Sequence, residues 1–253
     1  MIHGEKVGGA YRIDMARPPV NAFDGGFVDA WHEQLDEAQA SGCSVLHIRS
    51  SQKVFSAGAD LKMMQSMFAD AGGSKRLVAH VRRMQDLFDR IEALPLVSLA
   101  EISGSALGGG LELALACDLR VAADKAVIGL PEARIGLLPG GGGTQRLARL
   151  CGTAAAKRII LGGDAVDGKT AAALGIVQWS FPAQEVPSFC EDLVRRMLQA
   201  SGTALAACKR CMDQAYPPIR AGLDTELSEI SQLLDTADTH ARIQAFLEGK
   251  GGA

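Results

Sequence analysis

Three consecutive glycines near the middle of the chain, residues 108–110, constrain its fold more than any other feature. An apolar run at residues 96–102 precedes them, and a helical pattern at residues 111–117 follows them. Because glycine has no Cβ, the backbone here can approach a ligand closely and adopt conformations closed to other residues. Free N–H groups at the start of the next helix favour an oxygen that gains negative charge. The sequence therefore predicts an anion-stabilising turn that includes Gly109.

Two glutamates flank this turn. Glu112 follows the last glycine by two residues, and Glu132 stands in a second turn, directly after Pro131. Backbone donors beside two acids are typical of proton transfer next to a carbonyl group. Each glutamate alone also has a plain structural interpretation, because helices favour an acid in the first turn and loops often carry one. Their joint presence favours the functional interpretation.

An earlier loop has the same plan of strand, glycine-containing loop and helix. It occupies residues 55–60, after a predicted strand at residues 45–49, and it contains Gly58 and Ala59. If the two strands are neighbours, their loops can direct the N–H groups of Ala59 and Gly109 at one oxygen. This is the geometry of an oxyanion hole, in which losing one donor typically costs about 3 kcal/mol.

Composition excludes several classes of protein. The 253 residues are 47% hydrophobic and 22% charged, which is typical of a globular chain with one large domain or two small ones. The net charge of −3 and the aromatic content of 5% favour no nucleic-acid partner. No apolar run reaches the roughly 18 residues of a membrane span, and the N-terminus lacks a signal-peptide pattern. We therefore expect a cytoplasmic protein with no membrane partner.

The six cysteines are scattered along the chain, which indicates reduced thiols. Cys208 and Cys211 form a Cys-x-x-Cys pair, but no second pair or close histidines accompany it. Because the segment at residues 203–216 has a helical pattern, we interpret the two as packing residues. We expect no metal site.

Strands and helices alternate up to about residue 182, and helices dominate afterwards. The expected strands are two within residues 5–14 and one each at 45–49, 118–123, 126–130 and 176–180. The expected helices include residues 27–38, 75–93, 144–151, 153–161, 168–174, 187–200, 203–215, 219–235 and 238–248. This pattern predicts an α/β core at residues 1–190 and a helical region at residues 191–253.

Three blocks resemble the enoyl-CoA hydratase/isomerase, or crotonase, superfamily. They are Phe-Ser-Ala-Gly-Ala-Asp-Leu-Lys at residues 55–62, Gly-Ser-Ala-Leu-Gly-Gly-Gly-Leu-Glu at 104–112, and the segment 130–147, which contains the run of four glycines at 140–143. The loop at residues 17–22 is similar to the family's N-terminal loop near CoA. The resemblance implies a spiral of ββα repeats with a C-terminal helical trimerisation region. It also implies homotrimers, or hexamers built as dimers of trimers.

The resemblance further implies an acyl-CoA thioester substrate, with its carbonyl oxygen on the N–H groups of Ala59 and Gly109. The family's two hydratase glutamates match Glu112 and Glu132, which favours hydration of a trans-2-enoyl-CoA over one-acid chemistry. Glu112 is then the base toward water and Glu132 the acid toward carbon. No cofactor is implied beyond the CoA of the substrate, and isomerisation or a specialised degradative hydration stay open. The matched blocks also contain candidate substrate-binding residues: Ala22, Ala57, Asp60, Leu61, Lys62, Pro131 and Gly140.

Rival functions have weaker support. Residues 163–170 fit the P-loop pattern Gly-x4-Gly-Lys-Thr of nucleotide hydrolases. A helical pattern at residues 154–161 stands where a P-loop needs a strand, and Asp164 and Asp167 would repel phosphate. A serine hydrolase lacks the Gly-x-Ser-x-Gly pattern around Ser105. A non-catalytic crotonase-like protein is the remaining alternative.

Two positions depart from the family pattern. Glu101 occupies a strand position where the family has a small or apolar residue. A buried carboxylate there needs a partner or a proton, so Glu101 is interfacial or is a third acid near the site. Ala241 and Arg242 replace an acidic-glycine pair, which weakens any prediction that the C-terminal Lys250 contacts CoA.

Overall fold

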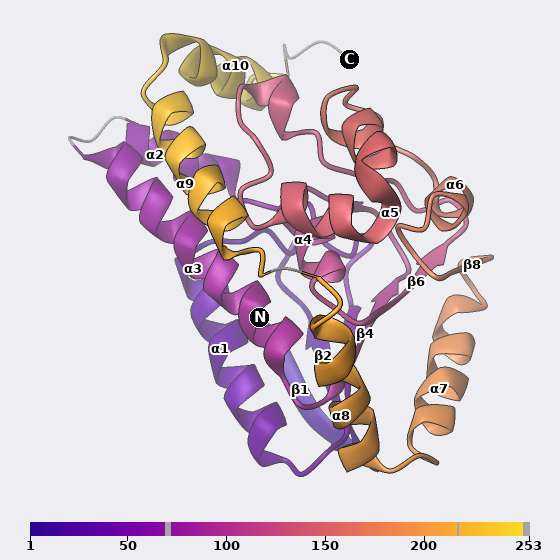
Figure 1. Cartoon of the computed structure of the whole chain (residues 1–253). Coiled ribbons are helices and arrows are strands. Elements are labelled where there is room, and N and C mark those ends of the chain that lie inside the picture. The colour runs from indigo at the N-terminus through magenta and orange to yellow at the C-terminus, as the bar shows by residue number, and fades with distance from the viewer. Residues whose placement is uncertain (69–71, 217, 250–253) are drawn as a thin grey trace.

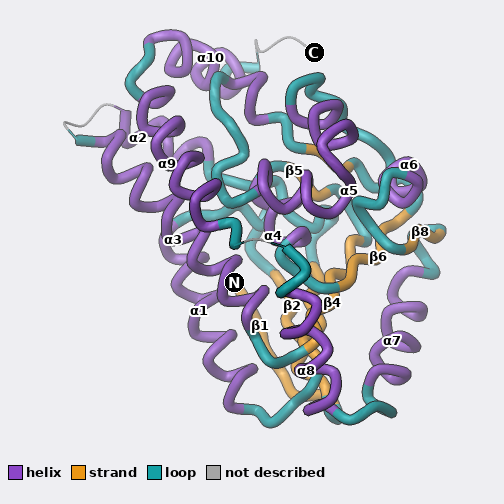
Figure 2. Tube along the Cα trace, in the orientation of Figure 1, coloured by secondary structure: helices purple, strands orange, loops and turns teal. Residues whose placement is uncertain are grey.

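A six-stranded sheet runs through the centre of the computed structural model, which describes residues 1–68, 72–216 and 218–249 (Figures 1 and 2). Its strand order is β1-β2-β3-β4-β6-β8. The β1–β2 hairpin is antiparallel and every later pairing is parallel. The strands are β1 (Ile2–Val7), β2 (Ala10–Met15), β3 (Val45–Ser50), β4 (Val97–Ile102), β6 (Leu119–Ala123) and β8 (Trp179–Phe181).

Short pairings form a second layer beside this sheet. Strands β5 (Ala106–Leu107) and β7 (Ile128–Gly129) are parallel, and Ser56 forms an isolated bridge to Ala106. Thus β3, β4 and β6 each lead into a short extended segment of the second layer. This repetition is the ββα spiral that the resemblance implies.

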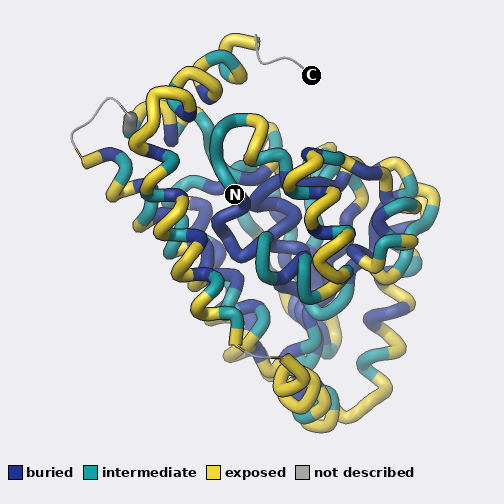
Figure 3. Tube along the Cα trace, turned by 45° about the horizontal axis from the view of Figure 1, so that its top comes forward, coloured by how far each residue is buried: buried dark blue, intermediate teal, exposed yellow. Residues whose placement is uncertain are grey.

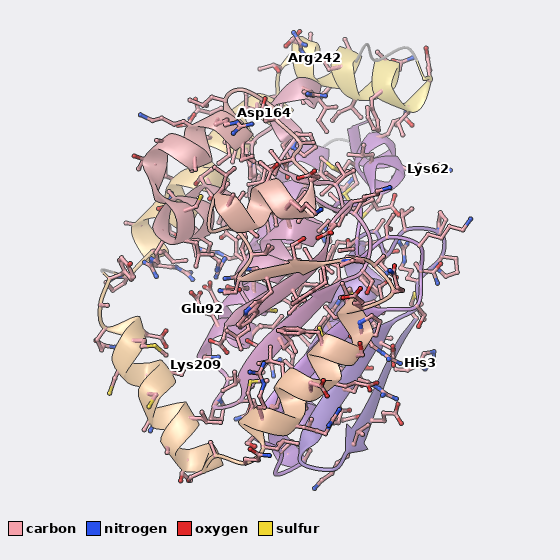
Figure 4. The ribbon with its side chains drawn as sticks, turned by 90° about the vertical axis from the view of Figure 1, so that its right-hand side faces the viewer. His3, Lys62, Glu92, Asp164, Lys209 and Arg242 are labelled. Atoms are coloured by element: carbon pink, nitrogen blue, oxygen red, sulfur yellow. The ribbon has the colours of Figure 1, made fainter. Side chains whose placement is uncertain are left out.

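Helices enclose the two layers. α1 and α3 lie side by side along one face of the sheet, and α7 covers the other face, against β3, β4 and β6 (Figures 1 and 4). α9 packs along α3, and α10 packs on α2. The helices are α1 (Gly25–Ala40), α2 (Leu61–Phe68), α3 (Gly73–Ala93), α4 (Gly109–Leu115), η1 (Glu132–Ile135), α5 (Gly143–Ile160), α6 (Gly168–Ala173), α7 (Val186–Met197), α8 (Gly202–Asp213), α9 (Arg220–Leu234) and α10 (Ala237–Leu247).

Buried residues concentrate where the layers meet, and the outer faces of the helices are exposed (Figure 3). Phe23, Phe27 and Phe88 pack edge to face in the main core, at centroid distances of 5.2 and 5.8 Å. A second apolar cluster joins α2, α3, α9 and α10 through Met64, Leu77, Ile230, Leu234 and Ile243. The C-terminal helices are therefore attached to the part of the core that carries residue 59 and its loop.

The sequence predicts most element positions, with two differences among the strands. The strand expected at residues 176–180 is β8, at Trp179–Phe181, because Ile176 and Val177 are buried in a turn after α6. The strand expected at residues 126–130 shortens to β7. The two helices expected at residues 144–151 and 153–161 are confirmed, because α5 is interrupted at Gly152, whose φ of +77° and ψ of 160° are not helical. The sequence also predicts a break near residues 71–73 and fraying at residues 249–253; of these, residues 71 and 250–253 fall outside the described part of the chain, and α3 begins at Gly73. The division at residue 190 stays a prediction.

Candidate active site

The two glycine-containing loops interlock at the carboxyl ends of neighbouring strands β3 and β4. The Leu107 N–H donates to the Ser56 carbonyl at 3.0 Å. Gly58 has φ +88°, and a Cβ placed on it would lie 2.8 Å from the Gly109 nitrogen. A Cβ on Gly110 would lie 2.4 Å from the Ser56 oxygen. Glycine is therefore required at both positions, because the two backbones approach too closely for a side chain.

This approach brings the two predicted N–H donors together. A Cβ placed on Gly109 would lie 3.7 Å from the Ala59 nitrogen, so the two residues face each other. Within the described residues, neither the Ala59 N–H nor the Gly109 N–H donates a backbone hydrogen bond. Two adjacent free donors in a dry site can stabilise an oxyanion.

Glu112 projects from α4, directly after these donors. The residue is 2% exposed, and its Oε1 accepts a hydrogen bond from the Gly143 N–H at 2.8 Å. Gly143 begins α5, and a Cβ on Gly141 would lie 2.6 Å from Glu112 Oε2. The glycines of residues 140–143 therefore enclose this carboxylate.

Glu132, in η1, has its carboxylate beside the glycines at residues 108–110. A Cβ placed on Gly108 would lie 2.9 Å from Glu132 Oε1, so this carboxylate lies against the first glycine of the triple. The residue is half-buried as a whole, but its Oε2 is buried and has no hydrogen-bond partner among the described residues. A buried, unpartnered carboxylate oxygen favours the protonated form.

Burial and mutual repulsion shift both acids. Burial is the main cause that raises the pKa of Glu112 well above its ordinary value, and the charges of Glu132 and Glu226 add to it. Burial likewise raises the pKa of Glu132 to about 7, with the charge of Glu226 adding to it. Such a coupled pair retains a shared proton near neutral pH.

The N-terminal loop is tied to the first donor loop. Asn21 Nδ2 donates to the Phe55 carbonyl at 2.9 Å, and the Asp60 N–H donates to the Phe23 carbonyl at 3.0 Å. Arg17 Nη1 donates to the Ala22 carbonyl at 2.7 Å, and Arg17 also forms an ion pair with Asp60. The predicted loop at residues 17–22 therefore lies beside the site.

The other predicted substrate-binding residues are dispersed around it. Ala57 and Lys62 are exposed, and the Lys62 side chain points outward from α2 (Figure 4). Leu61 is half-buried at the second apolar cluster, and Pro131 precedes η1. Gly140 is buried, and its carbonyl accepts from Gln85 Nε2 at 2.7 Å. Their contacts with substrate stay predictions.

One acid of this region, Glu226 of α9, is not among the site residues predicted from the sequence. It is 3% exposed, and burial raises its pKa to about 7. Its Oε2 accepts a hydrogen bond from the Gly142 N–H at 2.8 Å. A glutamate between Leu223 and Ile230 on the apolar face of a predicted helix is the signal that could have identified it.

Glu101 has a partner remote from these acids. Its Oε2 lies 2.9 Å from Nε2 of His47, and both side chains are buried beneath α7. Glu101, His47 and Cys190 place potential ligand atoms within 4.8 Å of one another. The direct hydrogen bond already accounts for the burial of Glu101 and His47. No interaction among the described residues joins Glu101 to Glu112 or Glu132, so it is not a third acid of this site.

Cys208 and Cys211 lie on α8, as predicted, but both are exposed, so their interpretation as packing residues is wrong for this chain. Those two positions are on the solvent face of α8, whereas Ala206 and Lys209 are buried.

The P-loop-like segment lacks the structure of a phosphate cradle. It follows helix α5 instead of a strand. The Asp167 side chain caps α6 by accepting from the Thr170 N–H at 2.8 Å, where a phosphate would bind. Lys169 lies 3.3 Å from Asp124 in an ion pair.

Among the described residues, no helix is long and apolar enough to cross a bilayer.

Known proteins resemble this chain in sequence and in fold. The profile of the enoyl-CoA hydratase/isomerase family matches residues 5–251. A probable enoyl-CoA hydratase of Bacillus subtilis is 36% identical over 93% of this chain and 91% of its own. The 2,3-dehydroadipyl-CoA hydratase of Escherichia coli is 34% identical over the same shares. The crystal structure of an enoyl-CoA hydratase from Bacillus halodurans has the same fold, with a TM-score of 0.89 at 23% identity over 96% of this chain and 99% of that one.

Proposed function

The chain belongs to the enoyl-CoA hydratase/isomerase, or crotonase, family, and we propose that it hydrates trans-2-enoyl-CoA thioesters to 3-hydroxyacyl-CoA. The observation that carries the proposal is a pair of glutamates, the buried Glu112 and Glu132 with its buried Oε2, beside two N–H groups that donate no backbone hydrogen bond among the described residues. Isomerisation of an enoyl-CoA needs only one acid, so the second glutamate favours addition of water. Relatives whose names include hydratase support the same choice.

The proposed reaction begins with the thioester carbonyl on the N–H groups of Ala59 and Gly109. Water adds through its oxygen to the β-carbon, and Glu112 accepts the proton that this water loses. The electron pair of the double bond moves toward the carbonyl, where the two donors stabilise the enolate-like oxygen. Glu132 then delivers a proton to the α-carbon. One water is consumed, and this chemistry needs no metal or redox cofactor.

Hydrogen bonding supports this division between base and acid. The Gly143 N–H donates to Glu112, which stabilises its ionised form. Glu132 Oε2 has no such donor among the described residues, which supports assigning the proton to Glu132 in the proposed reaction. A water that lies between the two carboxyl groups can then react without any change in the net charge of the pair.

A substrate screen tests the proposed function. We expect trans-2-enoyl-CoA thioesters to lose their conjugated absorbance in the presence of the protein, with 3-hydroxyacyl-CoA as the product. 3-Enoyl-CoA thioesters in the same assay test the isomerase alternative. Binding of CoA thioesters without any turnover would instead support the non-catalytic alternative.

The pH dependence of kcat tests the role of Glu132. Because an acid must carry its proton to act, and because burial raises the pKa of Glu132 to about 7, kcat should fall as pH rises through about 7. The measurement is kcat at saturating substrate from about pH 5 to 9. A kcat that rises over the alkaline half of this range would contradict the assignment of Glu132 as the acid.

We further propose that the protein forms a homotrimer or a homohexamer. The C-terminal helical region supports this, because its large apolar side chains Met212, Tyr216 and Phe246 are all more than half exposed in the single chain, at 66%, 53% and 53%. A cytoplasmic location also stays a proposal, and one relative, in Bos taurus, is named as mitochondrial.

A further inference from the structure

Helix α9 contributes one buried carboxylate to the region of the proposed active site. Glu226 Oε2 accepts from the Gly142 N–H at 2.8 Å, and its Oε1 accepts from the Thr144 hydroxyl at 2.5 Å. Gln85 Nε2 of α3 lies 3.3 Å from Oε2. Three donors from two segments therefore converge on a side chain that is 3% exposed. The proposed reaction assigns it no step.

Glu226 and Glu112 accept hydrogen bonds from the same turn, at residues 142–144. Gly143, between the two residues bound by Glu226, donates its own N–H to Glu112 Oε1 at 2.8 Å. Gln85 secures the start of the turn through the Gly140 carbonyl, at 2.7 Å, and Arg146 Nη1 donates to the Gly141 carbonyl at 3.0 Å. The direction of the Gly143 N–H is thus set by a closed set of hydrogen bonds.

We propose that Glu226 is a positioning residue: by holding the Gly142 N–H and the Thr144 hydroxyl, it directs the Gly143 N–H at Glu112 and fixes that carboxylate toward the reacting water. This inference rests on the proposed hydration. It also means that α9, from the far end of the chain, completes the site within one subunit.

The charge of Glu226 should have a measurable effect on the pKa of the other two acids near the turn. Glu112 of α4, Glu132 of η1 and Glu226 of α9 lie close enough for the charge of Glu226 to raise the pKa of both other acids. The positive charge of Arg146 of α5 lowers the pKa of Glu226, and Arg146 is itself paired with Asp89 and Glu92 of α3. Arg82 of α3 binds Gln85 and Asp224, on the outer side of the same network. Neutralising Glu226 should therefore lower the pKa of Glu112 and of Glu132.

The test compares Glu226→Gln and Glu226→Ala with Glu229→Gln, a control on the exposed side of α9. Glutamine can accept from the Gly142 N–H, while the Thr144 hydroxyl turns to accept from its amide. Glu226→Gln should therefore retain most of kcat, with the pH profile of kcat shifted to lower pH. Glu226→Ala releases the turn, and kcat should fall about 10- to 100-fold with little change in KM. Glu229→Gln should match the wild type in both respects.

A second measurement separates this proposal from the proposed function. Carbon-13 NMR of labelled glutamate carboxyls should show the pKa of Glu112 lowered by Glu226→Gln and unchanged by Glu229→Gln. If the wild-type protein hydrates no enoyl-CoA, hydration is wrong, and the NMR titration still decides whether Glu226 acts on Glu112. A folded Glu226→Ala protein with wild-type kcat would overturn the proposal. So would a Glu226→Gln protein with an unshifted kcat profile and an unshifted Glu112 titration, and this variant decides if Glu226→Ala does not fold.

Discussion

Glu132→Gln and Glu112→Gln are each expected to lower kcat for enoyl-CoA hydration by about 10²- to 10⁴-fold, the usual contribution of a general acid or base. Glutamine keeps the shape of each side chain, and its oxygen can still accept from the Gly143 N–H at position 112. It can neither receive the proton that water loses nor give one to the α-carbon. Steady-state hydration rates on one enoyl-CoA measure this directly.

Thermal unfolding of the same two variants separates a catalytic role from a structural one. Both carboxyl groups are buried and their pKa values are raised, which means that their ionised forms destabilise the fold. At pH 8, neutral glutamine at either position should therefore leave Tm unchanged or raise it. A variant that keeps full activity would refute the two-acid mechanism, and one that loses Tm and activity together would indicate a structural role.

Gly58→Ala is expected to lower kcat/KM by about 10²- to 10³-fold, the cost of losing one oxyanion donor. The new Cβ would lie 2.8 Å from the Gly109 nitrogen and 2.9 Å from the Leu107 oxygen. Both are backbone atoms, so relief requires the two loops to separate. Because Ala59 follows immediately, its N–H should no longer face the same oxygen as the Gly109 N–H. Hydration kinetics on a single substrate give the ratio.

Gly42→Ala is the matched control for that substitution. Gly42 also has a positive φ, +71°, but a Cβ there meets no atom within 4 Å. The control therefore carries the backbone strain of a left-handed alanine without the collision between loops. Equal losses of kcat/KM in the two variants would show that strain alone is responsible and that the close approach at Gly58 does not matter.

The sequence predicts the alternation of strands and helices well because a local pattern repeats along the chain, whereas the spiral itself is implied only by the resemblance to the family. The alternation of apolar strands, glycine-containing loops and amphipathic helices is readable within about twenty residues, and β3, β4, α3 and α9 lie where the pattern places them. The strand at residues 176–180 is misplaced for a physical reason. Ile176 and Val177 are as apolar as strand residues, but they fill the space beneath a turn, and hydrophobicity alone does not distinguish the two.

Contacts between distant segments limit how much of the candidate site can be predicted from the sequence. Ala59, Gly109, Glu112 and Glu132 are found from motifs, since each belongs to a short recognisable block. Glu226 belongs to none, and its partner Gly142 lies 84 residues earlier in a turn. Sequence alone shows only an acid on an apolar helical face. Whether such an acid is paired, and with what, depends on how two helices and a turn meet in space.

The buried His47–Glu101 pair has a consequence for how accurately the two donor loops meet. His47 of β3 stands opposite Leu99 of β4, and Glu101 lies two residues farther along the same face. Parallel strands of similar apolar residues tolerate a shift by two positions, because the same side chains still face inward. Such a shift would break the hydrogen bond between His47 and Glu101 while both side chains stayed buried. Two buried polar groups would then have no partner, which destabilises the fold. The pair therefore destabilises a sheet in which β3 and β4 are out of register. By fixing that register, it also fixes the position of Ala59 relative to Gly109, in the loops that follow the two strands.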